Sequence, residues 1–254
     1  MNVLIMGRRG LGKTTLAEFI AANLNANRVA FDPGDQYLDF VVRTSDLEVV
    51  RDEFERDWKE NPLSLSYIPP VGPDPTADQI EPYWNEFANL LWSFTGRHEG
   101  GASYSLIIDE SSELQSPSYV NPWLMRIIRR APRRERSDAN PVETIQTFHR
   151  PQDLNGIIES QVDEFYIFNM VKQRDLEVIA KNWGDDISEA VSKLRTPKTD
   201  PPGRDVLKLD AETGEWEVIT DSNLWYVDIR KPVEKSSPPP GWRMHQLEHQ
   251  YGEL

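Results

Sequence analysis

The segment GRRGLGKT, residues 7–14, constrains the fold of this chain more than any other feature. It matches the pattern G-x-x-x-x-G-K-[ST] at every required position, between an apolar run at residues 2–6 and a helical pattern that begins near Thr15. Such a loop surrounds phosphate groups with backbone N–H groups, and it needs glycine because a Cβ would block the close approach. Strand, loop and helix together predict a P-loop rather than a chance glycine-rich turn.

The residues of this loop predict a site for ATP and Mg²⁺. Lys13 is expected to reach the β- and γ-phosphates, and the Thr14 hydroxyl is expected to ligate Mg²⁺. Thr15 is expected to make a further phosphate contact. The other residues expected to bind the nucleotide complete the loop: Gly7, Arg8, Arg9, Gly10, Leu11 and Gly12.

Two acidic residues follow a second apolar run, YSLIIDE at residues 104–110. Asp109 is expected at the carboxyl end of a buried strand, where open α/β sheets place their ligands, so it can hold Mg²⁺ through water. Glu110 is then the expected base that activates the attacking water. A plain strand end is the competing interpretation. A glutamate in this position argues against a nucleotide or nucleoside kinase, which does not use water as its nucleophile.

Length and composition exclude several classes of protein. A chain of 254 residues is long enough for one large α/β domain, and the lack of cysteine excludes disulfides and cysteine-ligated metals. No apolar run approaches the roughly 18 residues of a membrane span, so a soluble protein is expected. The net charge of −14 argues against a surface that binds nucleic acid everywhere, so any DNA contact must be local.

Strand and helix patterns alternate along the chain, which predicts an α/β fold with a mainly parallel central sheet flanked by helices. With the P-loop, this is a P-loop NTPase of the RecA/ASCE type with a C-terminal β-hairpin extension. The motor domain is expected to span residues 1–230, followed by a proline-rich tail at 231–254. Further strands are expected at 28–32, 64–68, 142–148, 164–170 and 224–229, helices at 46–60, 80–94, 176–180, 187–194 and from Pro122 after an Asn121 N-cap, and the hairpin at 205–219.

An arginine-rich segment and a polar strand end complete the candidate site. Residues 126–136 contain six arginines and one glutamate. Three interpretations compete: an arginine inserted into a neighbouring subunit's site, a contact to DNA phosphates, and a solvated helix face. The next strand ends in Q-T-F-H-R-P, where Gln146 or His149 is expected to lie beside the γ-phosphate. Strand alternation alone does not choose between them.

These segments, with FHRPQDLNGIIESQVDEFYIF downstream, resemble the FtsK–HerA superfamily of DNA-pumping ATPases. The resemblance runs from Val3 to about Leu194, and its downstream part is the discriminating one because many ATPases share the other motifs. Members usually end the strand in glutamine, whereas His149 stands here and Gln146 lies three residues earlier. By this resemblance an arginine finger falls just before the strand, with three candidates: Arg133, Arg134 and Arg136.

A motor of this size, with no membrane segment before its P-loop, looks most like the genome-packaging ATPases of tailless, membrane-containing double-stranded DNA viruses. The resemblance implies a pentameric or hexameric ring with ATP sites between subunits, which pushes double-stranded DNA into a preformed capsid. It also implies capsid vertex or portal proteins as partners, and a place in the host cytoplasm or at the packaging vertex. The alternatives are a helicase or conjugation-type translocase, and a nucleotide-dependent switch that is not a motor.

Overall fold

Strand β1 lies near the centre of a nine-stranded sheet in the computed structural model, which describes residues 1–56, 61–72, 75–94, 103–130, 142–199 and 202–220. The strand order is β11-β10-β9-β1-β8-β5-β2-β4-β3. A separate pair, β6 and β7, forms a small antiparallel sheet. The strands are β1 Asn2–Met6, β2 Arg28–Phe31, β3 Val42–Thr44, β4 Ser64–Tyr67, β5 Tyr104–Ile108, β6 Gln115–Ser116, β7 Tyr119–Val120, β8 Val142–Phe148, β9 Glu164–Phe168, β10 Val206–Asp210 and β11 Trp216–Ile219.

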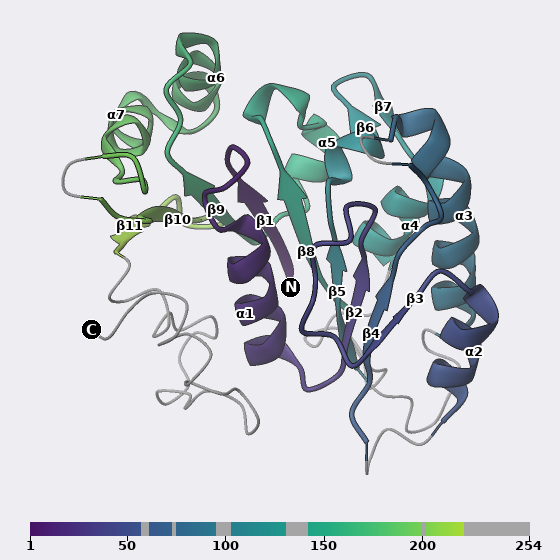
Figure 1. Ribbon diagram of the computed structural model, residues 1–254. Coiled ribbons are helices and arrows are strands. Elements are labelled where there is room, and N and C mark those ends of the chain that lie inside the picture. Colours follow the sequence, from purple (N-terminus) through teal and green to yellow (C-terminus); the bar gives the residue numbers. More distant parts are fainter. Residues whose placement is uncertain (57–60, 73–74, 95–102, 131–141, 200–201, 221–254) are drawn as a thin grey trace.

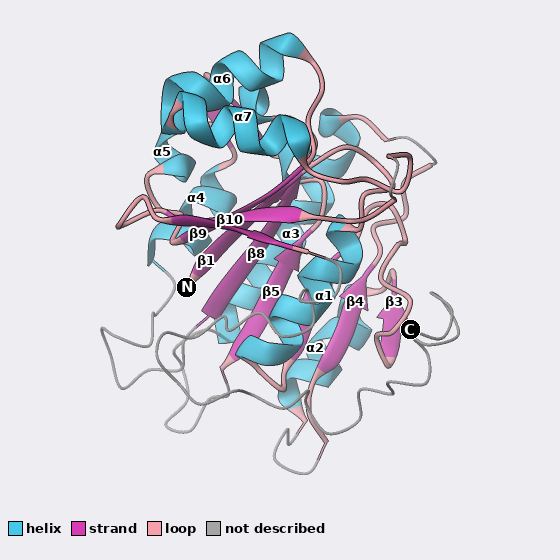
Figure 2. Cartoon of the chain, turned by 90° about the vertical axis from the view of Figure 1, so that its left-hand side faces the viewer, coloured by secondary structure: helices cyan, strands magenta, loops and turns pink. Residues whose placement is uncertain are grey.

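All pairs from β9 to β3 are parallel, and only β10 and β11 run antiparallel to their neighbours. The strands β1, β8 and β5 run side by side in Figure 2, and every residue of the three is buried. Near-continuous apolar strands of this kind need helices on both faces of the sheet. The predicted α/β fold, its mainly parallel sheet and its C-terminal hairpin are therefore confirmed.

Helices cover both faces, with α1 on one side and α3 and α4 on the other (Figure 1). Alternation along β1 separates the two cores: Val3 and Ile5 pack with α1, whereas Leu4 and Met6 pack with the helices of the opposite face. The helices are α1 Lys13–Leu24, α2 Leu47–Glu55, α3 Ala77–Phe94, α4 Pro122–Arg130, α5 Gly156–Glu159, α6 Gln173–Trp183 and α7 Asp185–Lys193, with 3₁₀ turns at Ser111–Glu113 and Pro151–Asp153.

The aromatic stripe of α3 is core packing. Trp84 and Phe87 are fully buried, and the Trp84 ring packs edge-on against Phe31 at 5.1 Å between centroids. Asn121 links this helix to α4, because its Oδ1 accepts hydrogen bonds from Trp84 Nε1 at 3.1 Å and from the Trp123 backbone N–H at 2.9 Å. The predicted N-cap is therefore confirmed, with Pro122 as the first residue of α4.

Some elements of the structure were not predicted, and some predicted elements lie outside the described residues. Strand β3 and the β6–β7 pair have three and two residues per strand, too few to produce a periodic pattern. The acidic helix, expected at 46–60, ends earlier, at Glu55, because the backbone of its C-cap Arg56 is extended (φ −74°, ψ 163°). The strand expected at 224–229 and the tail at 231–254 lie outside the described residues. None of the described helices is both long and apolar enough to cross a membrane.

Candidate nucleotide-hydrolysis site

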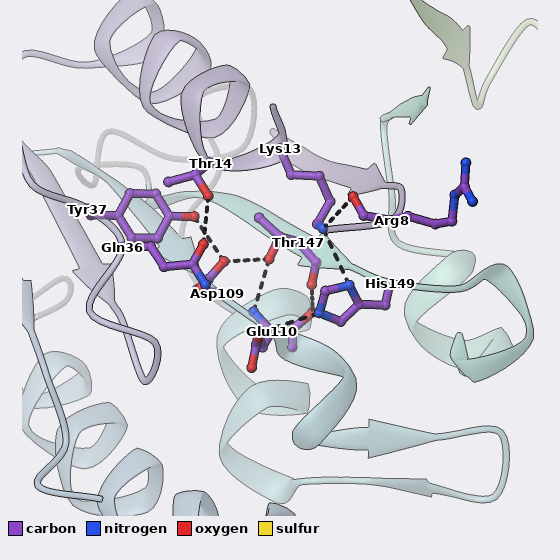
Figure 3. Close-up of polar contacts among 10 residues, drawn as sticks. Arg8, Lys13, Thr14, Gln36, Tyr37, Asp109, Glu110, Thr147 and His149 are labelled. Atoms are coloured by element: carbon purple, nitrogen blue, oxygen red, sulfur yellow. Dashed lines mark hydrogen bonds and ion pairs between the residues drawn. The ribbon is translucent and has the colours of Figure 1, made fainter. Parts of the chain in front are cut away.

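Three parallel strands end at one edge of the sheet and bring the predicted motifs together. The P-loop follows β1, Asp109 and Glu110 follow β5, and Thr147 and His149 lie at the end of β8, between the other two strands. Figure 3 shows their side chains converging. They border a cleft of ≈ 380 Å³ lined by Arg9, Gly10, Gly12, Lys13, Thr14, Thr15, Gln36, Asp109, Glu110, Thr147, His149 and Arg204.

The glycines of the loop meet specific backbone requirements. Gly10 and Gly12 have φ values of +83° and +99°, which side chains of L-residues rarely adopt. A Cβ on Gly7 would lie 2.7 Å from Phe168 Cβ, so the loop could not pack against the end of β9. Because Gly12 is the N-cap of α1, the unpaired N–H groups of the first turn point toward the cleft, where a phosphate can accept from them.

Lys13 crosses the cleft from the loop toward β8. Its Nζ lies 3.4 Å from the Arg8 carbonyl oxygen and 3.4 Å from His149 Nδ1. Burial lowers the pKa of Lys13, and the opposing charges of Asp109 and Glu110 offset part of that effect. Arg8 itself is exposed, and its side chain points away from the cleft in Figure 3. Leu11 is buried in the core beside α1, so its role there is packing.

Asp109 is 4% exposed, and only one of its two carboxylate oxygens has hydrogen-bond partners among the described residues. Its Oδ1 accepts hydrogen bonds from Thr147 Oγ1 at 2.7 Å and from the Tyr37 hydroxyl at 3.1 Å. Its Oδ2 is buried with no hydrogen-bond partner among the described residues. Burial raises the pKa of Asp109 to about 6. A buried carboxylate oxygen without a hydrogen bond lowers the stability of the fold unless a bound ion or water contacts it.

The residues fit a magnesium ion at this place. Thr14 and Asp109 both line the cleft, Asp109 Oδ2 has no hydrogen-bond partner among the described residues, and hard oxygen ligands are what Mg²⁺ prefers. Thr14 Oγ1 donates to Gln36 Oε1 at 3.2 Å, so a second oxygen lies beside it. Thr14 and Asp109 are therefore the residues that could hold the ion, directly or through water.

Glu110 adopts a backbone conformation that is uncommon for a residue with a side chain. Its φ and ψ are 48° and 43°, and its N–H donates to Thr147 Oγ1 at 2.9 Å. Its Oε1 lies 3.3 Å from His149 Nε2. This hydrogen bond is the main cause that lowers the pKa of Glu110, and the charges of His149 and Lys13 act in the same direction. The carboxylate is thus ionised at neutral pH, as a general base requires.

Strand alternation separates the two sensor candidates. Thr147 and His149 point to the α1 face and line the cleft, whereas Gln146 lies in the opposite core. Gln146 is fully buried, and its Oε1 accepts a hydrogen bond from Gln115 Nε2 at 3.4 Å. The structure therefore brings His149, and not Gln146, to Lys13 and Glu110.

Four residues that line or support the cleft were not predicted. Thr147 could have been found because it alternates with His149 on the same strand. Gln36 and Tyr37 follow β2, and their N–H groups donate to the buried Asp32 carboxylate at 2.8 and 2.9 Å. The position of Asp32 at a strand's carboxyl end was a usable signal. Arg204 stands in no recognisable sequence motif, so no signal in the sequence pointed to it.

The arginine-finger candidates Arg133, Arg134 and Arg136 lie outside the described residues. Of the arginine-rich segment, Arg126 is described, and its guanidinium carbon lies 4.4 Å from the Trp92 ring centroid and 5.0 Å from that of Trp123. This arginine therefore stacks between two aromatic rings on the α3–α4 surface, a cation–π arrangement.

Comparison with known proteins adds information on the fold. No protein-family model matches the chain, and no curated protein sequence matches it. The genome packaging NTPase B204 from Sulfolobus turreted icosahedral virus 2, in complex with ATP-gammaS, superimposes with a TM-score of 0.62 at 19% identity, over 85% of this chain and 95% of that chain. B204, the DNA-packaging ATPase from Sulfolobus turreted icosahedral virus, gives a TM-score of 0.57 at 17% identity over 85% and 95%.

These identities are too low to transfer a residue's role, but the match extends over nearly the whole of each B204 chain. The expected likeness to viral genome-packaging ATPases is therefore confirmed at the level of structure, and the chain has the P-loop NTPase fold of these proteins.

Proposed function

We propose that this chain is an ATP-hydrolysing DNA translocase that packages viral double-stranded DNA into a preformed capsid as a ring-shaped motor. The single observation that carries the proposal is a continuous set of contacts across the cleft. Lys13 Nζ contacts His149 Nδ1, and His149 Nε2 contacts Glu110 Oε1. Thr147 Oγ1 accepts a hydrogen bond from the Glu110 N–H and donates one to Asp109 Oδ1. A phosphate-binding residue is thus connected to the residues that activate water and hold a metal.

The chemistry follows from these positions. The P-loop N–H groups and Lys13 bind the triphosphate, and Thr14 and Asp109 would hold Mg²⁺, which would neutralise phosphate charge. The ionised Glu110 accepts a proton from water while the water oxygen attacks the γ-phosphorus. The bond from that phosphorus to the bridging oxygen breaks, and ADP leaves with the oxygen. Glu110 then returns its proton to phosphate or solvent.

His149 is the proposed γ-phosphate sensor. Its Nδ1 and a γ-phosphate oxygen compete for the same Lys13 ammonium group, since Lys13 Nζ lies 3.4 Å from that nitrogen. ATP binding therefore changes the surroundings of His149, and its other nitrogen transmits the change to Glu110. Gln146 is the weaker candidate because it lies on the opposite face of β8.

A ring with shared sites is supported by the position of the described residues on either side of 131–141. Asn2 Nδ2, at the start of β1, donates to the Ile128 carbonyl near the end of α4, and Val142 begins β8 at the same amino edge. The cleft lies at the other edge, roughly 20 Å away along a strand of this length. We propose that one of Arg133, Arg134 and Arg136 acts in a neighbour's cleft, since the described residues on both sides of 131–141 lie away from the chain's own cleft.

Local positive charge supports DNA as the partner despite the net charge of −14. Besides Arg9, which lines the cleft, four exposed basic side chains follow the adjacent strands β1, β8 and β9 at the cleft edge, where phosphate contacts would lie close to His149: Arg8, Arg150, Lys172 and Arg174. We further propose a pentamer or hexamer, capsid vertex or portal proteins as partners, and a location in the host cytoplasm with attachment at the packaging vertex.

The test is steady-state ATP hydrolysis with and without double-stranded or single-stranded DNA, with Glu110→Gln as the inactive control. Strong stimulation by double-stranded DNA, lost in the control, is the expected result. Stimulation by single strands alone would favour a helicase or conjugation-type translocase. Slow hydrolysis that neither DNA changes, in rings that bind ATP, would favour a nucleotide-dependent switch.

A further inference from the structure

The segment between α7 and β10 brings an arginine to the nucleotide cleft. Arg204 lines the cleft, and its Cδ lies 3.8 Å from where a Cβ on Gly12 would be. Because Gly12 is the N-cap of α1, the arginine stem lies beside the loop residues expected to bind phosphate. Among the described residues that line the cleft, Arg204 is the cationic one that comes neither from the P-loop nor from the end of β8.

Hydrogen bonds on both sides of Arg204 hold its backbone in place. Arg195 donates to both carboxylate oxygens of Asp205, from Nε at 2.9 Å and from Nη2 at 2.7 Å, and the Asp205 side chain is only 7% exposed. The Gly203 N–H donates to the Thr196 carbonyl at 3.0 Å. Preorganised groups bind ligands more tightly because less conformational entropy is lost.

The start of the segment is tied to the sheet as well. Asn169, directly after β9, donates from Nδ2 to the carbonyl oxygens of Ser192 at 3.1 Å and Leu194 at 2.9 Å. Asn169 is itself 4% exposed. The segment is therefore fixed relative to β9, and through Phe168 to the P-loop, so Arg204 keeps its place at the cleft.

The strand order shows which end of a nucleotide Arg204 faces. Glu110 and His149 mark the γ-phosphate end, and they come from β5 and β8 on one side of β1. Arg204 precedes β10, which lies on the other side of β1, beyond β9. When the γ-phosphate lies beside β8 and the triphosphate crosses the P-loop, the α-phosphate, ribose and base therefore extend toward Arg204.

We propose that Arg204 binds the part of the nucleotide that ADP and ATP share, its α-phosphate and nucleoside end. This inference rests on the proposed function, since it requires the cleft to bind ATP. A guanidinium suits the position because it can pair with a phosphate through two N–H groups or stack on a flat base. Such a contact does not depend on the γ-phosphate, so it holds the nucleotide before and after hydrolysis.

The experiment measures the Kd of MgADP and of Mg-ATPγS by titration calorimetry for the unmodified chain, Arg204→Ala and Arg204→Lys. Lys198→Ala is the matched control, because it removes one exposed positive charge from the same segment outside the cleft. Circular dichroism melting shows whether each variant is folded. We expect Arg204→Ala to raise both Kd values by the same factor, about tenfold, as the loss of one hydrogen bond to a charged group predicts.

Arg204→Lys is expected to recover part of the affinity, and Lys198→Ala to leave both Kd values unchanged. Unchanged Kd values in a folded Arg204→Ala variant would overturn the inference while leaving the proposed function intact. A loss confined to Mg-ATPγS would also overturn it, because Arg204 would then lie at the γ-phosphate end. If the unmodified chain binds neither nucleotide, the proposed function fails together with the inference.

Discussion

His149 stands between the residue expected to bind the γ-phosphate and the residue expected to activate water. Its two nitrogens lie 3.4 Å from Lys13 Nζ and 3.3 Å from Glu110 Oε1. The resemblance to DNA-pumping ATPases implies glutamine here, and a glutamine amide also has one donor and one acceptor end. The two side chains can therefore make the same pair of contacts.

Replacement of His149 should change the pH dependence of hydrolysis. The hydrogen bond with His149 is the main cause of the lowered pKa of Glu110, so its loss raises that pKa. In His149→Ala the acid limb of the kcat profile should therefore move to higher pH, with kcat at pH 7 reduced about tenfold or more. His149→Gln should retain more activity. An unchanged acid limb in His149→Ala would contradict the proposed contact.

Glu18 should make the protein less stable as the pH rises. Burial, with the charges of Asp39 and Asp32, raises the pKa of Glu18 to about 8, and Arg28 opposes the shift. The folded chain thus holds a proton that the unfolded chain releases above about pH 4.5. The stability that this proton gives is fully present below about pH 4.5 and is lost as the pH rises through about 8.

Glu18→Gln tests this effect by urea denaturation at pH 5 and pH 8. The free energy of unfolding of the variant, relative to the unmodified chain, should rise by about 2 kcal/mol between the two, a figure reduced for partial solvent exposure. Glu48→Gln, on the exposed face of α2, is the control and should show no such rise. Equal pH dependence in all three proteins would contradict the raised pKa.

At the scale of elements, the sequence predicted what local patterns determine. The apolar runs of β1, β5 and β8, the stripe of α3 and the hairpin β10–β11 each carry a period or turn signal. Because β1, β5 and β8 are parallel, the motif residues that follow these strands lie together at one edge of the sheet. The order of the strands could not be predicted, since it depends on pairing between distant segments, and the position of Arg204 depends on that order.

Asn121 joins the helices α3 and α4, so its loss should destabilise the helix layer that they form on one face of the sheet. Its amide is fully buried, accepts from Trp84 and the first turn of α4, and donates to Asn85 Oδ1 at 2.9 Å. Asn121→Ala should lower the free energy of unfolding by about 3 kcal/mol, because a cap is lost and the Trp84 N–H loses its buried partner. Asn89→Ala, at an exposed position of α3, is the control. A loss below about 1 kcal/mol in urea denaturation would contradict the link.

At the scale of the whole molecule, the ring proposal predicts complementation between subunits. A variant at the arginine finger lacks the group it gives to its neighbour, and Glu110→Gln lacks the base of its own cleft. Mixed rings of Glu110→Gln with Arg133→Ala, Arg134→Ala or Arg136→Ala should regain hydrolysis for one of the three arginines, since some clefts then contain both groups. Steady-state ATPase assays of mixed and separate variants measure it. No recovery with any arginine would contradict an arginine supplied by the neighbour.

The central claim is that ATP hydrolysis moves double-stranded DNA, and displacement of a triplex-forming third strand tests it most directly. A duplex carries a labelled third strand at one end, and a motor that travels along the duplex strips it off. The expected result is release that requires ATP and an intact duplex and is absent with Glu110→Gln. Rapid ATP hydrolysis on double-stranded DNA without release of the third strand would contradict the claim.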